Sequence, residues 1–388
     1  MFSARVPSDR EPNPLARAVA AARESGRRVI DLTATNPTAV GLSYPQSLLQ
    51  PLASAAALTY APEPFGQRAA REAVAADYAR RGIRIATDRI VLTASTSEAY
   101  SLLFKLLCGP VGDAVLVPVP SYPLFEHLTR LDGVAPSPYR IEFHGRWAVD
   151  GDSLAGAWAP NVRAVLAVSP NNPTGSMLSP AELSMLDGLC ADRGAAVVLD
   201  EVFADYTLDG SPRTAPGGAP ARALTFRLGG LSKSAGLPQV KLGWIGVDGP
   251  EPLVREAMDR LELICDTYLS VATPVQAAAA ALIAAGAGIR EQILERVRAN
   301  YRTLADLAQR FPSIEVLPVE AGWSAVLRVP STRTEEDLVL HLIERDGVLA
   351  HPGFFFDFPH EAFLVVSLLP DPSSFAAGVR TVMERASE

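Results

Sequence analysis

A lysine in a run of small residues is the first group in this 388-residue chain whose type and setting suit covalent chemistry. Lys233 stands in the sequence Gly-Gly-Leu-Ser-Lys-Ser-Ala-Gly, between two apolar runs at 223–226 and 242–247. Strand ends commonly present reactive side chains in α/β proteins, and a lysine amine can form a Schiff base with a carbonyl compound. A surface lysine in a glycine-rich loop is the ordinary alternative. The motifs that precede Lys233 distinguish between these two interpretations.

Two polar motifs precede the lysine, each directly after an apolar run. Asn172 lies in a turn sequence, Ser-Pro-Asn-Asn-Pro-Thr-Gly, after the run 164–168. Asp200 follows the run 195–199. Taken separately, the first is an ordinary strand-to-helix turn and the second a polar strand end. Together with Lys233 they suit one chemistry, because an amide can bind a phenolic oxygen and a carboxylate can pair with a protonated pyridine nitrogen while the lysine makes the imine.

This order of motifs resembles that of the class I/II aminotransferases, the fold-type-I pyridoxal-phosphate enzymes typified by aspartate aminotransferase. The resemblance covers nearly the whole chain. It implies that Lys233 holds pyridoxal 5′-phosphate as a Schiff base, that Asp200 pairs with the pyridine nitrogen and that Asn172 binds the ring's O3′. It also implies an enzyme that transfers an amino group between a small-molecule amino donor and a 2-oxo acid.

The resemblance extends to groups that would hold the phosphate and the ring of the cofactor. Ser95, Thr96 and Ser97 open a helix after a strand, as in the family's phosphate cup, although an ordinary helix cap has the same composition. Tyr122 stands where the family stacks an aromatic ring on the cofactor. Tyr60 stands where a tyrosine reaches the phosphate of the neighbouring subunit, which implies a homodimer with shared active sites. Packing within their own loops is the alternative for both tyrosines.

Four positions depart from the family's usual residues. Lys241 replaces the arginine that clamps the phosphate, and lysine lacks the two-pronged geometry of a guanidinium. Gly230 replaces a serine, and Phe203 replaces a tyrosine that donates to O3′. Aligned on a Pro-Gly turn, Val365 stands where the family has the arginine that binds the substrate carboxylate. These departures leave the cofactor chemistry in place but remove the usual basis for assigning the substrate.

Without an arginine at position 365, another group has to meet the substrate carboxylate, because a buried unpaired charge is costly. The Asn172 amide and backbone groups near 35–37 can each donate a hydrogen bond. Arg5 and His351 are the candidates for a full cation, with an exposed tail arginine and a packed loop histidine as the ordinary alternatives. Tyr122, Trp323 and Phe354 are expected around the substrate, which favours an apolar or aromatic side chain. If no cation replaces the arginine, the predicted substrate becomes an amine or a carboxyl-modified amino acid.

Apolar runs alternate with helical patterns, which predicts an α/β fold. Continuous apolar runs indicate strands buried on both faces of a mostly parallel sheet, and the resemblance implies fold type I with seven such strands. The predicted large domain spans 45–285, and a smaller α+β domain combines 1–44 with 286–388. A long helix over 274–309 is expected to break at its two glycines, Gly286 and Gly288.

The composition restricts the functional classes further. The formal net charge is −8 and the basic residues form no cluster, so nucleic acid is not expected as a partner. The three cysteines match neither a metal site nor a disulfide framework. No apolar stretch is expected to reach membrane-spanning length, since the run 277–285 is too short, and the N-terminal residues have no apolar run for export, which predicts a cytoplasmic protein.

Three functional hypotheses remain open. An aminotransferase is the leading one. Another pyridoxal-phosphate enzyme on the same fold, such as a lyase, decarboxylase, racemase or cyclase, is the second, because one fold hosts all of these reactions. A non-enzymatic relative is the third, and the presence of Lys233, Asp200 and Asn172 argues against it.

Overall fold

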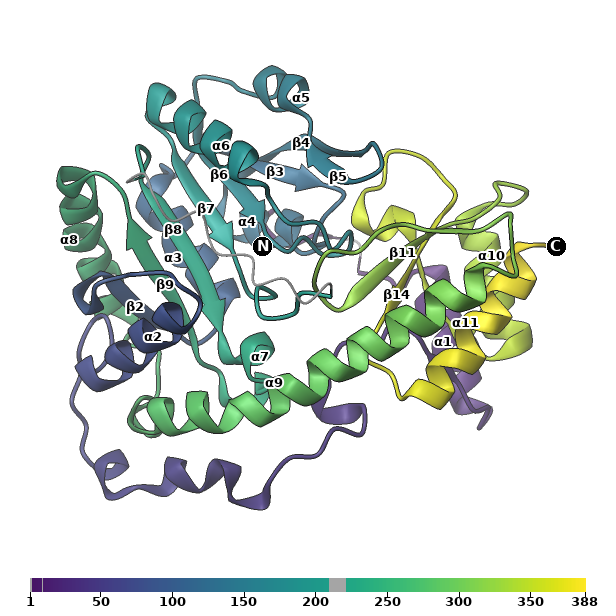
Figure 1. The fold of residues 1–388 in the computed structure, drawn as a ribbon. Coiled ribbons are helices and arrows are strands. Elements are labelled where there is room, and N and C mark those ends of the chain that lie inside the picture. The colour runs from purple at the N-terminus through teal and green to yellow at the C-terminus, as the bar shows by residue number, and fades with distance from the viewer. Residues whose placement is uncertain (1, 9, 209–220) are drawn as a thin grey trace.

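A large twisted sheet forms the centre of the molecule (Figure 1). The computed structural model describes residues 2–8, 10–208 and 221–388. The sheet has eight strands in the order β2-β9-β8-β7-β6-β3-β4-β5. Its strands are β2 (Ile90–Thr93), β3 (Ala114–Val119), β4 (Ala135–Phe143), β5 (Trp147–Val149), β6 (Val162–Val168), β7 (Ala196–Asp200), β8 (Thr225–Gly230) and β9 (Gly243–Asp248).

The middle of this sheet is parallel, from β8 through β7, β6 and β3 to β4. At the edges, β9 runs antiparallel to both β2 and β8, and β5 runs antiparallel to β4. Every residue of β2 and β7 is buried, as the uninterrupted apolar runs predict. The mostly parallel α/β fold is therefore confirmed.

The strand count exceeds the expected seven because β5 adds a three-residue antiparallel strand at the edge. Its neighbour β4 was also absent from the sequence-based prediction. Two prolines, Pro136 and Pro138, and several exposed residues interrupt the apolar pattern of β4. Because β5 pairs only with Ile141–Phe143, both prolines lie in a part of β4 that has β3 as its one neighbour, and proline is tolerated in strands mainly at such edges.

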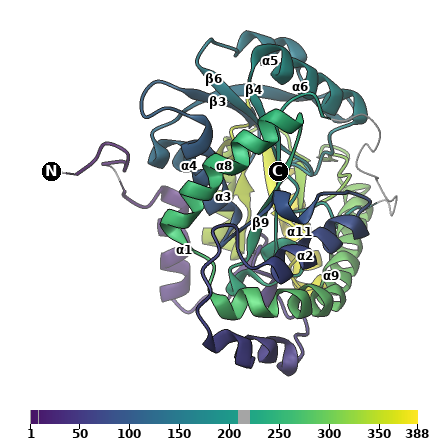
Figure 2. The same cartoon turned by 90° about the vertical axis from the view of Figure 1, so that its left-hand side faces the viewer.

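Helices cover both faces of the large sheet. One face packs against α3, α4 and α8, and Figure 2 views the molecule from the side of α8. The other face packs against α5 and α6. The bounds are α2 (Arg68–Arg80), α3 (Thr96–Leu107), α4 (Phe125–Asp132), α5 (Gly151–Gly156), α6 (Pro180–Arg193) and α8 (Glu251–Tyr268).

The start of α6 shows how local sequence fixes an element. Ser179 Oγ accepts a hydrogen bond from the backbone N–H of Glu182 at 3.2 Å. The Glu182 carboxylate in turn accepts from the backbone N–H of Ser179 at 2.9 Å. This reciprocal capping box satisfies two backbone donors that would otherwise lack partners, so α6 begins at the capping sequence.

A second group of elements lies beside the large sheet (Figure 1). It contains a four-stranded sheet in the order β10-β11-β14-β13. The short strand β1 pairs in parallel with β12, which joins the N-terminal residues to the C-terminal part of the chain, while the division into domains of 45–285 and of 1–44 with 286–388 stays a prediction. The bounds are α1 (Pro14–Glu24), β1 (Ile30–Asp31), β10 (Glu315–Val316), β11 (Ser324–Arg328), α10 (Glu335–His341), β12 (Val348–Leu349), β13 (His351–Pro352), β14 (Phe363–Ser367) and α11 (Pro372–Ala386).

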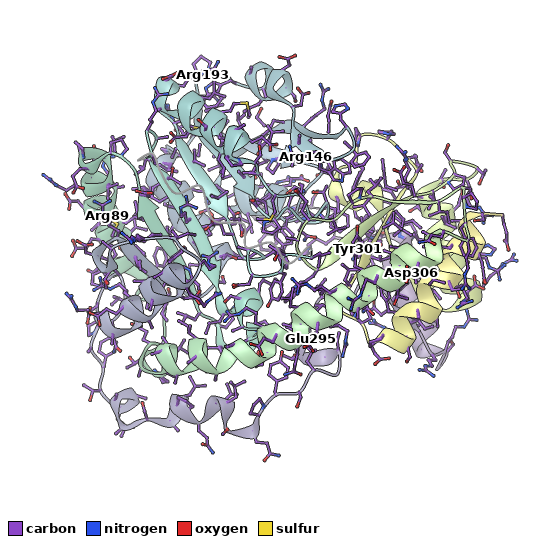
Figure 3. All side chains as sticks on the ribbon, in the orientation of Figure 1. Arg89, Arg146, Arg193, Glu295, Tyr301 and Asp306 are labelled. Atoms are coloured by element: carbon purple, nitrogen blue, oxygen red, sulfur yellow. The ribbon has the colours of Figure 1, made fainter. Side chains whose placement is uncertain are left out.

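The long helix α9 runs without a break from Thr273 to Ala308, contrary to the expected interruption at its glycines. Glu295, Tyr301 and Asp306 mark its course in Figure 3. A Cβ atom at Gly286 would lie 2.4 Å from the Cβ of Ala235, whereas one at Gly288 would meet nothing within 4 Å. Gly286 therefore permits a close packing contact rather than ending the helix.

Helix α9 also corrects the expectation about membrane-spanning stretches. An 18-residue window of α9 has a mean hydropathy of 1.3, so by length and composition alone this helix is able to cross a membrane. Core helices of globular proteins give the same signal. Here α9 packs against α2, against α11 and against the 3-10 helix η2 (Gln46–Ala53), and 33% of the apolar window is buried.

Candidate active site

A cavity of about 340 Å³ lies where strands β6, β7 and β8 end and α3 begins. Ligands commonly bind at the carboxyl ends of parallel strands. The structure brings to this cavity all of the predicted cofactor and catalytic residues except Tyr60. These are Ser95, Thr96, Ser97, Tyr122, Asn172, Asp200, Phe203, Lys233 and Lys241.

Asp200 is the last residue of β7 and is buried, with 8% of its surface exposed. Its Oδ1 accepts the backbone N–H of Val202 at 3.1 Å, and its Oδ2 accepts the hydroxyl of Tyr100 at 2.9 Å. Burial raises the pKa of the carboxyl to about 6, while these two hydrogen bonds act in the opposite direction. Tyr100 was not singled out from the sequence, because a tyrosine on the buried side of a helix carries no motif.

Lys233 lies on α7 (Leu231–Ser234), the single helical turn that follows β8. Its Nζ atom lies 5.3 Å from the ring centre of Trp323 and 5.8 Å from that of Phe203. Burial lowers the pKa of the amine, and the charge of Asp200 opposes this shift. A lowered pKa increases the fraction of neutral, nucleophilic amine.

Several contacts hold α7 in place. The Tyr206 hydroxyl donates to the backbone carbonyl of Lys233. The Arg290 guanidinium, from α9, donates to the carbonyl of Ser234 at 3.1 Å. The Ser234 hydroxyl donates to the carbonyl of Gly230 at 3.0 Å. Two of these hydrogen bonds come from other segments and one lies within the turn, and together they hold the backbone that carries Lys233.

One end of the cavity suits an anion. Ser95 caps α3, and Thr96 and Ser97 form its first turn, where backbone N–H groups and the helix dipole favour negative charge. Lys241 reaches the same cavity from a left-handed backbone conformation with φ of 59°. A Cβ at Gly243 would lie 2.9 Å from the Ser95 carbonyl carbon, so this glycine lets β9 approach the helix start. A phosphate fits this end of the cavity.

Aromatic and amide groups line the rest of the cavity. Tyr122 is 37% exposed and makes an edge contact with Phe125, with ring centres 5.9 Å apart. The Ser324 hydroxyl, at the start of β11, donates to the side-chain oxygen Oδ1 of Asn172 at 3.3 Å. Ser324 was also missed from the sequence. Its contact orients the Asn172 amide, so that the amide nitrogen remains for a ligand.

Phe203 and Trp323 form the aromatic wall beside the lysine. Their rings meet edge to face with centres 5.3 Å apart, and Tyr206 meets the same indole at 5.1 Å. The indole N–H of Trp323 is buried and has no hydrogen-bond partner among the described residues. A buried donor of this kind carries an energetic cost that a bound acceptor would relieve.

The structure keeps the remaining candidates away from the lining of this cavity. Tyr60 is 74% exposed and lines a different hollow, near Tyr268. Val365 is buried in β14 within an apolar cluster. Arg5 lies beside Gly133, at the end of α4, where a Cβ atom on the glycine would be 3.3 Å from its guanidinium.

The two other residues considered around the substrate also lie elsewhere. His351 packs against Phe355 and Phe356, and burial lowers its pKa, which disfavours the cationic form. Phe354 is exposed and contacts Phe355. Among the described residues that line the cavity, the cations are Lys233 and Lys241.

The fold and this arrangement of groups define the class of protein. The family model described as aminotransferase class I and II matches residues 30–373. The chain therefore belongs to this family and is an aminotransferase, and members of the family depend on pyridoxal phosphate.

Similar proteins include two bacterial enzymes at 25% identity. One is the glutamate-pyruvate aminotransferase AlaA of Haemophilus influenzae, aligned over 357 residues that cover 89% of this chain and 87% of the relative. The other is the alanine aminotransferase of Mycobacterium bovis, aligned over 377 residues that cover 94% and 87%.

Solved structures show the same fold. The alanine aminotransferase of Pyrococcus furiosus superposes with a TM-score of 0.87 at 22% identity, covering 99% of this chain and 100% of that one. A double mutant of the Thermus thermophilus aspartate aminotransferase gives a TM-score of 0.83 at 22% identity, with 100% and 99% covered. The expected fold type I is thereby confirmed.

Proposed function

We propose that the cavity binds pyridoxal 5′-phosphate through a covalent bond to Lys233, and that the protein transfers an amino group from an amino acid to a 2-oxo acid. One observation carries the proposal. The Lys233 amine, the buried Asp200 carboxylate and the N-terminus of α3 meet at one cavity. These groups match the three parts of the cofactor: its carbonyl carbon, its ring nitrogen and its phosphate.

The residues of the chain divide the work. When bound, pyridoxal phosphate supplies a carbonyl that captures the substrate's amine and a ring that withdraws electrons from its Cα atom. Asp200 keeps the ring nitrogen protonated, and Asn172 binds the neighbouring oxygen. The first turn of α3 and Lys241 hold the phosphate, and Tyr122 packs on the ring. Lys233 Nζ then moves a proton at the substrate's Cα atom as general base and acid.

An amino acid with an apolar or aromatic side chain is the proposed donor. The cavity wall contains the aromatic and aliphatic residues Tyr122, Phe125, Leu128, Phe203 and Trp323. A dicarboxylic substrate carries a second charge, which needs a further cation when it is desolvated. Both lining cations, Lys233 and Lys241, already have proposed roles toward the cofactor. We therefore expect neutral donors, namely the amide of Asn172 and the indole N–H of Trp323, to meet the α-carboxylate.

The same absence of a guanidinium from the described cavity lining favours a second candidate. In this candidate the cofactor and Lys233 act on an amine or on an amino acid with a modified carboxyl group. The reaction is then transamination of an atypical donor or another reaction of the same cofactor, such as a decarboxylation or a cyclisation.

A panel of amino donors, added without any 2-oxo acid, separates these candidates. The panel contains phenylalanine, leucine, alanine, glutamate, carboxyl-blocked amino acids and simple amines. We expect the cofactor's absorption to change fastest with phenylalanine or leucine as it is converted to the aminated form. A preference for glutamate would contradict the apolar assignment. Reaction with blocked amino acids and amines alone would favour the second candidate, and conversion of no donor would count against transamination.

We further propose a homodimer. Leu58 and Tyr60 are 89% and 74% exposed, and Tyr60 shares a hollow with Tyr268, which is 55% exposed. Exposed apolar side chains that gather at one place commonly mark an interface. In the proposed dimer a second copy would cover this surface and Tyr60 would reach the partner's cofactor phosphate, as the resemblance to the family implies. A cytoplasmic location is proposed as well, and the three free cysteines support a reducing compartment.

A further inference from the structure

We propose that Tyr100 is a positioning residue that acts through Asp200: its hydroxyl fixes the orientation and the ionised state of the carboxylate that receives the cofactor's ring nitrogen. This inference rests on the proposed function, because it assumes that Asp200 faces that nitrogen. It assigns a task to a side chain that no motif in the sequence points to.

The geometry holds the tyrosine in one position. Its ring packs against Phe104 and Phe125, with ring centres 6.1 and 5.5 Å away. Tyr100 is 2% exposed and Asp200 is 8% exposed, so water does not compete strongly for their 2.9 Å hydrogen bond. Burial keeps the pKa of the Tyr100 hydroxyl well above its usual value, which leaves it protonated and able to donate.

Two donors act on the two carboxylate oxygens. The Val202 N–H occupies Oδ1 and the Tyr100 hydroxyl occupies Oδ2. Such donors favour the ionised form of a buried carboxyl, which desolvation would otherwise protonate. Only the ionised form can pair with a pyridinium. The other titratable groups that act on Asp200 are Glu201, Lys233 and Tyr122.

The contact also links two parts of the site. Tyr100 lies on α3, and the first turn of the same helix forms the anion end of the cavity. Asp200 lies at the end of β7, which belongs to the central sheet. The hydrogen bond therefore sets the position of the ring-nitrogen partner relative to the phosphate end.

The test is the variant Tyr100→Phe, which removes one hydroxyl and keeps the ring. The protein is freed of cofactor and titrated with pyridoxal phosphate, and separately with an analogue in which carbon replaces the ring nitrogen. We expect affinity for pyridoxal phosphate to fall about tenfold at neutral pH. The acid limb of the affinity profile should move to higher pH, because the carboxyl loses a donor to its ionised form. Affinity for the analogue should stay unchanged.

Tyr139→Phe is the matched control, because it also removes a buried hydroxyl, one that donates to the Leu166 carbonyl at 2.8 Å and not to the Asp200 carboxylate. It should not alter the ratio of the two affinities. Tyr100→Met, which removes the hydroxyl and leaves a flexible apolar side chain, serves if the phenylalanine variant does not fold and must give the same change in ratio.

Asp200→Asn separates this inference from the proposed function. If the asparagine variant loses the preference for pyridoxal phosphate over the analogue while Tyr100→Phe and Tyr100→Met keep it, the role of Tyr100 is overturned. If the asparagine variant itself keeps the preference, Asp200 does not face the ring nitrogen and the proposed placement of the cofactor is wrong.

Discussion

At the scale of single residues, Lys233 is the group on which the proposed chemistry depends. Burial lowers the pKa of its amine, and its backbone is held by Tyr206. We expect Lys233→Ala to abolish covalent attachment of pyridoxal phosphate after borohydride reduction, as measured by the mass of the intact protein. Lys241→Ala is the control and should keep covalent attachment with weaker cofactor binding, because Lys241 contributes only charge at the phosphate. Covalently bound cofactor in the Lys233→Ala protein would show that Lys233 is not the attachment site.

Phe203 gives a second prediction at this scale. It lines the cavity beside Lys233 and has no hydroxyl to donate to the ring oxygen O3′. A donor to that oxygen stabilises its ionised form and favours the form of the lysine–cofactor linkage whose nitrogen carries no proton. Phe203→Tyr should therefore lower the pH midpoint of the bound cofactor's absorption change. The measurement is a spectroscopic pH titration. An unchanged or higher midpoint would show that residue 203 does not face O3′.

At the scale of elements, the two glycines of α9 offer a matched pair. Gly286 contacts Ala235 just beyond the lysine-bearing turn, whereas Gly288 faces open space. We expect Gly286→Ala to destabilise the protein by about 1–3 kcal/mol, since the new methyl group overpacks this contact. Gly288→Ala should be neutral or stabilise by up to about 1 kcal/mol through helix propensity.

Denaturant unfolding of both variants, followed by helical circular dichroism, checks this prediction. Gly286→Ala should also weaken cofactor binding, because Ala235 caps the turn that carries Lys233. Equal stability of the two variants would mean that α9 and α7 pack less closely than the structure shows.

At the scale of the whole molecule, the proposed dimer predicts the effect of a charge on its surface. Leu58→Glu should weaken association, because burying a carboxylate in an apolar interface is costly. Val111→Glu is the control. Val111 is 87% exposed, close to the 89% of Leu58, but it lies in the loop before β3, at the opposite end of that strand from the cavity. Sedimentation velocity should show dimers for the parent and the control, and more monomer for Leu58→Glu. A fully active monomeric parent would rule out shared active sites.

The sequence by itself determined most of the fold and the principal candidates of the site. Apolar runs such as those of β2 and β7 are strands because they bury both faces, and the capping box of α6 fixes a helix start within a few residues. The residues Asn172, Asp200 and Lys233 were identified because their motifs follow one another in the order that resembles a known family, and each motif stands at or after the end of such a strand. These signals are local, so a linear pattern is enough to reveal them.

Only the tertiary structure decided which other side chains join the site. Tyr100 meets Asp200 across 100 positions of the chain, and Ser324 meets Asn172 across 152. The tertiary structure also shows that Val365 lies in an apolar cluster and that α9 continues through Gly286. It shows as well that the indole of Trp323 lies beside Lys233. Periodicity, capping and turn propensity act over a few residues and cannot specify contacts between distant segments. Those contacts form only when packing of the whole chain brings the segments together.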